Sequence, residues 1–177
     1  MKQVVGVVLA GGKSSRMGKN KALLDFRGKP LVVHMCDLLR TAGVDDVVIS
    51  GAVQGYETIP DETPHEGPAR AMAWLLQMFL GRAARLLFVP VDMPFLTTDT
   101  LRRLAAQPGN VYTEGHLLPL CLAPAAALKA ESIYDLLEEV SAKSINMEPD
   151  ADGEFANLNT PVEWQRFVEG AAWPILD

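Results

Sequence analysis

A short basic stretch directly follows two adjacent glycines near the start of the chain. Gly11-Gly12 is followed by Lys13, Arg16, Lys19 and Lys21, and no acidic residue lies among them. Adjacent glycines let backbone N–H groups turn toward one ligand as a concave nest, which suits phosphate oxygens. Arg16 can bind two of those oxygens while Lys21 adds a point charge. The stretch therefore predicts a phosphate-binding loop, with a solvated turn as the alternative.

The remainder of the chain is acidic, which sets this stretch apart. The 177 residues carry 16 Lys and Arg against 22 Asp and Glu, a formal net charge of −6. Four of the cations lie between Lys13 and Lys21, so 12 cations face 22 anions elsewhere. Proteins that coat nucleic acid or an anionic membrane need a basic face. We therefore expect neither nucleic acid nor a membrane as a partner.

One carboxylate follows a later apolar stretch. Asp92 comes directly after Phe88-Val89-Pro90-Val91 and before Met93-Pro94. Mg²⁺ is usually held by one or two carboxylates together with substrate phosphates, so Asp92 is a candidate magnesium ligand. The alternative is that Asp92 only caps the turn before the next helix. The Asp-x-Asp pair of sugar-transferring enzymes is not formed, because a proline occupies position 94.

Two widespread phosphate-binding motifs do not fit the glycine loop. Gly12-Lys13-Ser14 resembles the end of a P-loop, but that motif needs a glycine where Val7 stands. The dinucleotide pattern Gly-x-Gly-x-x-Gly is not formed either. A P-loop hydrolase, which would release inorganic phosphate, is kept only as an alternative.

The elements that must position these residues alternate between strands and helices. The β-branched run Val4–Leu9 is typical of a strand buried on both faces of a parallel sheet. Further strands are expected at Val47–Ile49, at Glu57–Ile59 as a weak one, at Leu86–Val91, and at Val111–Thr113 and Leu117–Leu122, which can form a hairpin. Helices are expected at Leu31–Leu39 before Gly43, at Ala69–Leu80, from Thr98 to Ala106, at Ile133–Val140, and after the capping box Thr160-Pro161-Val162-Glu163.

This alternation predicts an α/β fold with a mostly parallel sheet, made mixed by the hairpin. Ligands of such sheets bind beyond the carboxyl ends of the strands. The glycine loop and Asp92 each follow a buried strand, so we expect them to line one crevice. No internal repeat or linker divides the sequence, and we expect residues 1–177 to form a single domain.

Cysteine and histidine usage adds little chemistry. Cys36 and Cys121 are too few for a Cys-rich zinc site or a disulfide scaffold, and they favour a reducing compartment, by default the cytoplasm. His34, His65 and His116 lack metal-ligand spacing and are assigned to structural or surface positions.

The glycine loop is part of a longer motif. Leu9-Ala10-Gly11-Gly12-x-x-x-Arg16-Met17-Gly18-x-x-Lys21-x-Leu23-Leu24, followed by Gly28-Lys29-Pro30-Leu31, closely resembles the nucleotidyltransferase family that includes molybdenum cofactor guanylyltransferase. The resemblance implies a Rossmann-like three-layer sandwich of the GT-A-like nucleotidyltransferase type, with a mixed central sheet. It implies that Arg16 and Lys21 contact phosphates and that Asp92 binds Mg²⁺, which makes these three the expected catalytic residues. Leu9, Ala10, Gly11 and Gly12 would lie beside the nucleotide.

Further positions match the family in part. Asn157-Leu158-Asn159-Thr160-Pro161 is similar to its Asn-x-Asn-Thr-Pro segment, which makes Asn157 a candidate second magnesium ligand or acceptor contact. Asn159 could equally be a turn residue. The resemblance also implies nucleotide contacts for Asp61 and Ser50, although the family often has asparagine at position 50. Two other departures are Asn20, where the family usually has aspartate, and Ala71, where the second glycine of its Gly-Pro-x-x-Gly loop is expected.

The resemblance implies a reaction. GMP would pass from GTP to a phosphate of a molybdopterin-type acceptor, with release of pyrophosphate. Such a phosphate is already anionic at neutral pH, so in-line positioning and charge neutralisation suffice without a covalent intermediate. Cytidylyl transfer, a sugar-phosphate acceptor and a non-catalytic nucleotide-binding module remain alternatives. Proteins that handle the molybdenum cofactor are expected as transient partners.

Overall fold

A six-stranded mixed sheet forms the centre of the molecule. The computed structural model describes residues 3–11, 20–62, 66–147 and 153–168. The strand order is β4-β1-β5-β7-β6-β8. In chain order these strands are β1 (Val4–Leu9), β4 (Asp46–Ser50), β5 (Arg85–Pro90), β6 (Val111–Thr113), β7 (Leu120–Leu122) and β8 (Lys143–Ile145).

The first half of the sheet is parallel and the hairpin makes it mixed. Strands β4, β1 and β5 run parallel, whereas β7 is antiparallel to both β5 and β6. Strand β8 pairs parallel with β6 at the far edge. The α/β fold with a mixed sheet is thus confirmed, and the carboxyl ends of β1 and β5 lie side by side.

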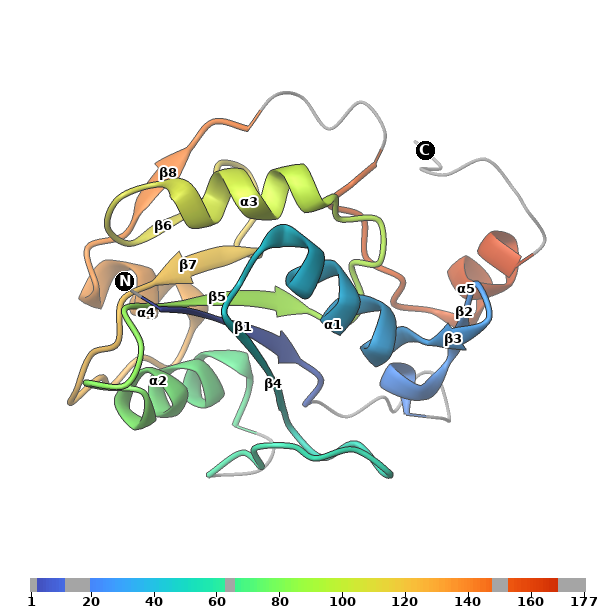
Figure 1. The fold of residues 1–177 in the computed structure, drawn as a ribbon, viewed down its shortest axis with the longest axis horizontal. Coiled ribbons are helices and arrows are strands. Elements are labelled where there is room, and N and C mark those ends of the chain that lie inside the picture. The colour runs from blue at the N-terminus through green and yellow to red at the C-terminus, as the bar shows by residue number, and fades with distance from the viewer. Residues whose placement is uncertain (1–2, 12–19, 63–65, 148–152, 169–177) are drawn as a thin grey trace.

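Helices cover both faces of the sheet (Figure 1). On one face α1 (Leu31–Ala42) packs with α3 (Thr98–Ala106), and on the other α2 (Pro68–Met78) packs with α4 (Ile133–Glu139). Helix α5 (Pro161–Val168) lies beside a two-stranded hairpin of β2 (Asp25–Phe26) and β3 (Lys29–Pro30). There the ring of Phe26 stacks on that of Phe167, with centroids 4.7 Å apart.

Strand β1 is apolar without interruption because both of its faces are buried. Val5 and Val7 pack into the core under α2, and Val8 packs into the core under α1. Gly6 leaves room for the side chain of Leu39, whose Cδ1 lies 3.0 Å from where a Cβ on Gly6 would stand. A strand packed on both faces is held firmly in place, which fixes the point at which the chain leaves the sheet at Ala10 and Gly11.

The structure corrects three element predictions and adds elements that the sequence did not indicate. Glu57–Ile59 makes only the single bridge between Ile59 and Ser50, so the predicted strand is wrong and β4 is an edge strand. Strand β7 begins at Leu120, because the apolar residues before it line a cavity instead of extending the ladder. Helix α2 ends at Met78, and Leu80 beyond it is 52% exposed. The short β2–β3 hairpin and β8 were not predicted.

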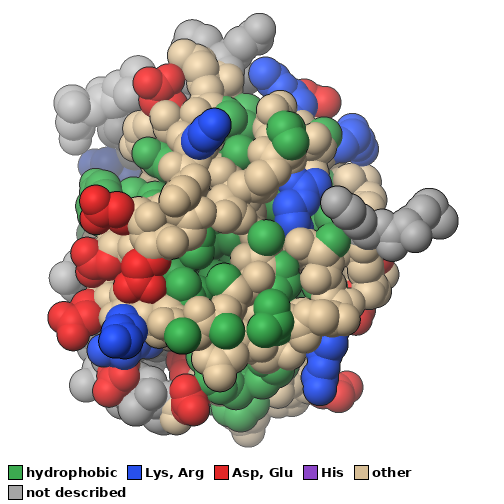
Figure 2. All heavy atoms as spheres, turned by 90° about the vertical axis from the view of Figure 1, so that its left-hand side faces the viewer, with side chains coloured by type: hydrophobic (Ala, Val, Ile, Leu, Met, Phe, Trp, Pro, Cys, Tyr) green, Lys and Arg blue, Asp and Glu red, His purple; other side chains and the backbone are tan. Residues whose placement is uncertain are grey.

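Figure 2 shows the face at the amino-terminal ends of β1 and β5, where Asp and Glu side chains lie along one side of a hydrophobic centre. Both cysteines are buried and unpaired, and burial raises the pKa of the Cys121 thiol to about 11. Within the described ranges, no helix combines the length and the apolar character that crossing a membrane requires.

Candidate active site

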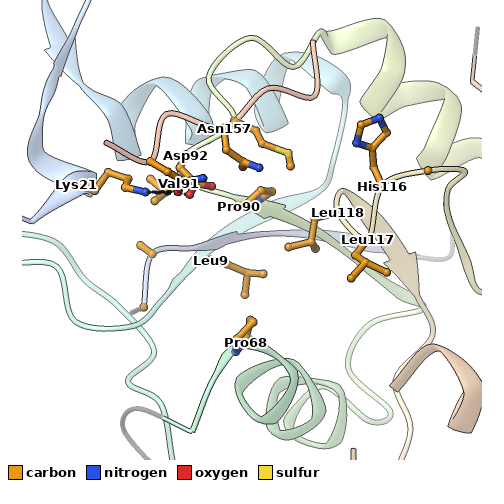
Figure 3. Close-up of a pocket in the computed structure, with 15 residues that line it drawn as sticks. Leu9, Lys21, Pro68, Pro90, Val91, Asp92, His116, Leu117, Leu118 and Asn157 are labelled. Carbon is orange, nitrogen blue, oxygen red and sulfur yellow. Dashed lines mark hydrogen bonds and ion pairs between the residues drawn. The ribbon is translucent and has the colours of Figure 1, made fainter. Parts of the chain in front are cut away.

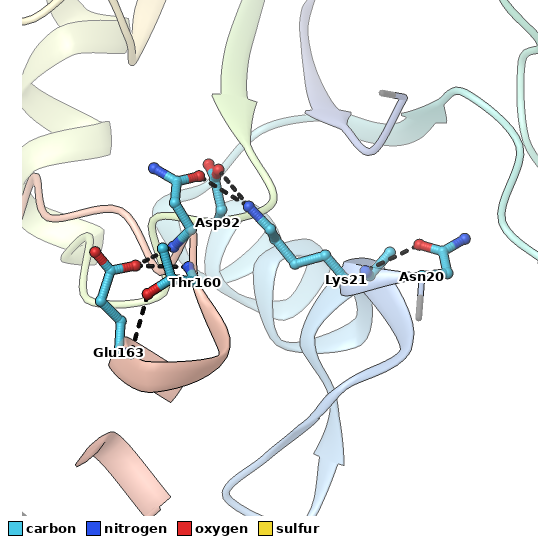
Figure 4. Close-up of polar contacts among 7 residues, drawn as sticks. Asn20, Lys21, Asp92, Thr160 and Glu163 are labelled. Carbon is cyan, nitrogen blue, oxygen red and sulfur yellow. Dashed lines mark hydrogen bonds and ion pairs between the residues drawn. The ribbon is translucent and has the colours of Figure 1, made fainter. Parts of the chain in front are cut away.

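Lys21 and Asp92 meet beyond the ends of β1 and β5. The Nζ atom of Lys21 lies 3.0 Å from Oδ2 of Asp92, and their side chains are only 14% and 21% exposed (Figure 4). Lys21 begins a short 3₁₀ helix, Lys21–Leu23, and Asp92 lies two residues past β5. The structure thus brings together two predicted catalytic residues. Arg16 and Gly12 lie outside the described residues.

Asp92 does not cap the helix that follows it. The N-cap of α3 is Thr97, whose Oγ1 accepts the backbone N–H of Thr100 at 3.2 Å. The ladder of β5 continues one step through the N–H of Val91, which donates to the carbonyl of Leu9 at 3.1 Å. Asp92 therefore leaves the sheet at a fixed point with its carboxylate toward the cavity, and Thr97 supplies the helix cap.

The segment before α5 returns to the same place. Asn159 Oδ1 accepts a hydrogen bond from Lys21 Nζ at 2.9 Å. Asn157 lines the same cavity, and the buried Leu158 between them anchors the segment. The motif predicts a ligand role for Asn157 and leaves Asn159 as a possible turn residue, although side chains two apart in an extended segment lie on one side. That spacing could have indicated both asparagines.

A cavity of about 550 Å³ connects these groups (Figure 3). This volume lies in the usual range for small-molecule sites. In Figure 3, Lys21 and Asp92 stand at one end, His116, Leu117 and Leu118 at the other. The walls come from the ends of β1 and β5, from the start of α2 and from the segments before β7 and α5. The lining residues are Leu9, Ala10, Gly11, Lys21, Pro68, Pro90, Val91, Asp92, Met93, Gly115, His116, Leu117, Leu118, Asn157 and Asn159.

A smaller recess adjoins the cavity and shares Leu9, Gly11 and Pro68 with it. Ser50 Oγ donates a hydrogen bond to Asp61 Oδ1 at 3.3 Å in this recess. A Cβ on Gly11 would lie 2.7 Å from Asp61 Oδ2, so only glycine leaves the carboxylate in place. The predicted nucleotide contacts Ser50 and Asp61 therefore lie beside the β1 loop.

His116 contributes a flat wall at the far end of the cavity. Its ring stacks on the buried ring of Phe155, with centroids 4.4 Å apart and an interplanar angle of 18°. His116, which we predict from the sequence to be a structural or surface residue, lines the cavity. His116 lies in the loop between β6 and β7, so no helical or strand periodicity in the sequence indicates its role.

The departures from the family motif are accommodated locally. Asn20 Oδ1 accepts the N–H of Ala22 at 3.1 Å, and its Nδ2 donates to the carbonyl of Ala52 at 3.3 Å. Asn20 therefore caps the short helix that begins with Lys21, and that lysine is held by Asp92 and Asn159. Ala71 is buried and lines the smaller recess.

The donor set fits a cation held partly by a substrate. Asp92 and Asn157 offer oxygen atoms to one cavity. Among the residues that the structure describes, no three His, Cys, Asp or Glu side chains form a cluster suited to a metal ion. Mg²⁺ fits such a sparse set, since phosphate oxygens and water complete its coordination.

Comparison with known families decides the class of protein. Residues 6–150 match the family model described as the MobA-like NTP transferase domain. The chain belongs to the MobA-like NTP transferase family. This membership confirms the resemblance read from the glycine motif, and the transferase is a nucleotidyltransferase.

Individual relatives cover almost the whole transferase. It is 38% identical to the molybdenum cofactor guanylyltransferase of Xanthomonas euvesicatoria pv. vesicatoria, over 92% of this chain and 93% of that protein. It is 31% identical to the protein of the same name from Shewanella frigidimarina, over 94% and 96%. The crystal structure of molybdopterin-guanine dinucleotide biosynthesis protein A from Archaeoglobus fulgidus superposes with a TM-score of 0.71 at 20% identity, over 93% and 97%, which confirms the fold.

Proposed function

We propose that this transferase moves GMP from GTP to a phosphate of a molybdopterin-type acceptor and releases pyrophosphate, with residues 1–177 acting as one nucleotidyltransferase domain. The observation that carries the proposal is the contact of Lys21 with Asp92 at 3.0 Å on the wall of a cavity of about 550 Å³. Relatives 38% and 31% identical bear the name of this activity.

Lys21 would offset part of the negative charge of the triphosphate. Its ammonium group lies in the cavity and is largely shielded from water, which strengthens its attraction for phosphate oxygens. Arg16 would add a second cation with two donors, as the motif predicts. Charge that builds on the departing pyrophosphate would be stabilised by groups already in position.

Asp92, with Asn157, would hold Mg²⁺. When bound, the ion supplies positive charge to the phosphate oxygens. In the structure Lys21 compensates the charge of Asp92. Nucleotide and metal together would release Lys21 from that role and leave its charge for the phosphates.

Asp61 would read the base. Guanine presents two adjacent donors, N1–H and the 2-amino group, and a carboxylate offers two acceptors at matching separation. Asp61 lies in the recess that adjoins the β1 loop, and Ser50 holds one of its oxygens. Cytosine lacks this pair of donors, so the recess favours guanylyl over cytidylyl transfer.

The acceptor would occupy the far end of the cavity. Leu117, Leu118 and the ring of His116 give this end an apolar surface with one flat wall. A planar heterocycle such as a pterin suits that wall, since offset stacking is favourable for aromatic rings. Its phosphate would then point along the cavity toward Lys21 and Asp92.

Pyrophosphate release tests the function. Purified protein would be incubated with Mg²⁺, molybdopterin and each of GTP, CTP, ATP and UTP, and pyrophosphate measured over time. We expect release with GTP and molybdopterin together, and its loss when EDTA removes the metal. Release only with CTP would transfer the proposal to the cytidylyl alternative. Nucleotide binding without release, seen as a ligand-induced rise in Tm, would indicate the non-catalytic module.

A further inference from the structure

The first turn of α5 is tied to the segment that precedes it. Glu163 Oε2 accepts the backbone N–H of Asn159 at 2.6 Å and that of Thr160 at 2.7 Å. In return, Thr160 Oγ1 accepts the N–H of Glu163 at 3.2 Å. This is the predicted capping box, extended by one residue, and one carboxylate fixes two consecutive peptide groups (Figure 4).

The first of those peptide groups is that of Asn159, whose side chain accepts a hydrogen bond from Lys21. Asn159 Oδ1 accepts from Lys21 Nζ at 2.9 Å, while Asp92 Oδ2 lies 3.0 Å from the same nitrogen. Asn159 itself is exposed. The position of its side-chain amide therefore depends on its backbone, which is held by the hydrogen bond from the Asn159 N–H to Glu163. A continuous line of hydrogen bonds thus leads from α5 to the cavity.

Lysine needs such support more than most side chains. Its four-carbon stem has many rotamers, and fixing them costs conformational entropy. Asp92 supplies one fixed partner, but a carboxylate that also binds a metal cannot serve Lys21 alone. Asn159 carries no charge, so it can keep its bond to Lys21 when a triphosphate and a metal are bound.

We propose that Glu163 is a positioning residue for Lys21 and acts through Asn159. It holds the ammonium group where negative charge develops on the triphosphate during transfer, so the group is already in place in the transition state. The inference rests on the proposed function only where it assigns Lys21 to phosphate. The coupling of Glu163 to Lys21 is a separate property of the protein.

The chain offers a matched control. Helix α4 begins with the same kind of box, in which Ser132 Oγ accepts the N–H of Asp135 at 3.1 Å and Asp135 Oδ2 accepts the N–H of Ser132 at 2.9 Å. Neither residue lines the cavity. Asp135→Ala therefore removes a capping carboxylate without touching Lys21, whereas Glu163→Ala removes both a cap and the support of Asn159.

The chemical reactivity of Lys21 tests the coupling without any turnover. The wild type and the Glu163→Ala, Glu163→Gln and Asp135→Ala variants would be labelled with an amine-reactive reagent, and the rate at Lys21 followed by peptide mass spectrometry. Lys29, paired with Asp37 at the surface, serves as the internal reference. We expect Glu163→Ala to raise the Lys21 rate relative to Lys29 by about two- to tenfold, the worth of one hydrogen bond. Glu163→Gln keeps an acceptor oxygen and should stay near the wild type.

Two labelling results would overturn the inference. An unchanged Lys21 rate in Glu163→Ala refutes the coupling. An equal rise in Asp135→Ala assigns the effect to general loosening of the fold. Tm values for all variants establish that each is folded at the labelling temperature, and Glu163→Gln still tests the geometry if Glu163→Ala does not fold.

Kinetics then separate this inference from the proposed function. With GTP, molybdopterin and Mg²⁺, Glu163→Ala should lower kcat by about tenfold, since small displacements of a catalytic group are costly. The KM for GTP should change less, and Glu163→Gln should restore most of kcat. A wild type that releases no pyrophosphate refutes the proposed function and leaves the labelling result standing. A normal kcat in Glu163→Ala refutes the positioning role.

Discussion

The backbone N–H of Leu158 donates to the carbonyl oxygen of Asp92 at 2.8 Å. This one bond joins the end of β5 to a segment from the last part of the chain. It places Asn157 and Asn159 beside the Asp92 carboxylate, where Lys21 arrives from the opposite side. The candidate site thus depends on three chain segments that only the fold brings together, and substitutions in each should affect turnover differently.

Removal of either member of the central ion pair should abolish most activity. Lys21→Ala and Asp92→Ala should each lower kcat for pyrophosphate release by about 10²- to 10³-fold, as expected when one preorganised electrostatic partner is lost. Neither should prevent folding, because both side chains lie at the cavity wall outside the two hydrophobic cores. Lys29→Ala removes a surface ion pair and is the control. Turnover near the wild type in either variant at the cavity contradicts the assignment.

Asp61 should control the choice of base. Asp61→Asn replaces two acceptors by one acceptor and one donor, which mismatches the paired donors of guanine. We expect the ratio of kcat/KM for GTP to that for CTP to fall by about tenfold, the effect of one lost or mismatched hydrogen bond to a charged group. Glu62→Gln changes the neighbouring exposed acid and should leave the ratio unaltered. An unaltered ratio in Asp61→Asn removes Asp61 from base recognition.

A close approach of two glycines supports the loop after β1. Gly51 has φ +98°, and a Cβ there would lie 2.4 Å from the backbone nitrogen of Gly11. Gly51→Ala should lower the free energy of unfolding by about 3 kcal/mol through strain and overlap together. Gly55 has φ +86° with open space around it, so Gly55→Ala should cost only about 1 kcal/mol. Urea unfolding of both variants measures the difference, and equal losses would show that the close approach costs nothing.

The sequence predicts the structure best where one local rule decides it. Buried apolar runs located β1 and β5, Gly43 ended α1 in the left-handed conformation, and the box at Thr160 opened α5. Because parallel strands end at one edge of a sheet, the meeting of Lys21 and Asp92 also followed from the pattern.

The remaining features depend on tertiary contacts that no local rule encodes. Leu117 and Leu118 read as strand residues, yet they line the cavity because β7 begins only at Leu120. Asn159 and His116 owe their positions to loops, and loops are placed by the elements they join. Strand β8 has two exposed polar residues, Lys143 and Ser144, before Ile145, so no apolar run indicates it in the sequence.

Acidification should destabilise the protein through His34. Burial lowers the pKa of His34 below its ordinary value of 6.5, and the charges of Lys29 and Arg27 lower it further, against the opposing effects of Asp37 and the Pro94 carbonyl. That carbonyl lies 2.8 Å from Nε2, which donates to it. The unfolded chain therefore binds a proton at a higher pH than the folded chain does. Stability is full above about pH 6.5 and falls as the pH drops toward the folded-state pKa.

A substitution isolates this contribution. His34→Gln keeps a donor for Pro94 but does not titrate, so its Tm should fall less than that of the wild type between about pH 7.5 and about pH 5.5. The difference between the two curves removes the effect of other titrating groups. Parallel curves would show that His34 takes up its proton equally in both states.

Substitution of His116 should weaken binding of the acceptor and leave binding of GTP unchanged. If the ring that stacks on Phe155 also supports a planar acceptor, His116→Ala should raise the KM for molybdopterin by about two- to tenfold, the range of one aromatic contact. The KM for GTP should stay unchanged, because the expected nucleotide contacts Leu9 and Gly11 lie beside Pro68, at a different wall of the cavity from His116. His116→Phe keeps a flat ring without a titrating nitrogen and should stay near the wild type. If His116→Phe weakens acceptor binding as much as His116→Ala, an imidazole hydrogen bond, not stacking, holds the acceptor. If neither variant changes that KM, the acceptor lies elsewhere, and the cavity beyond Asp92 serves another part of the nucleotide.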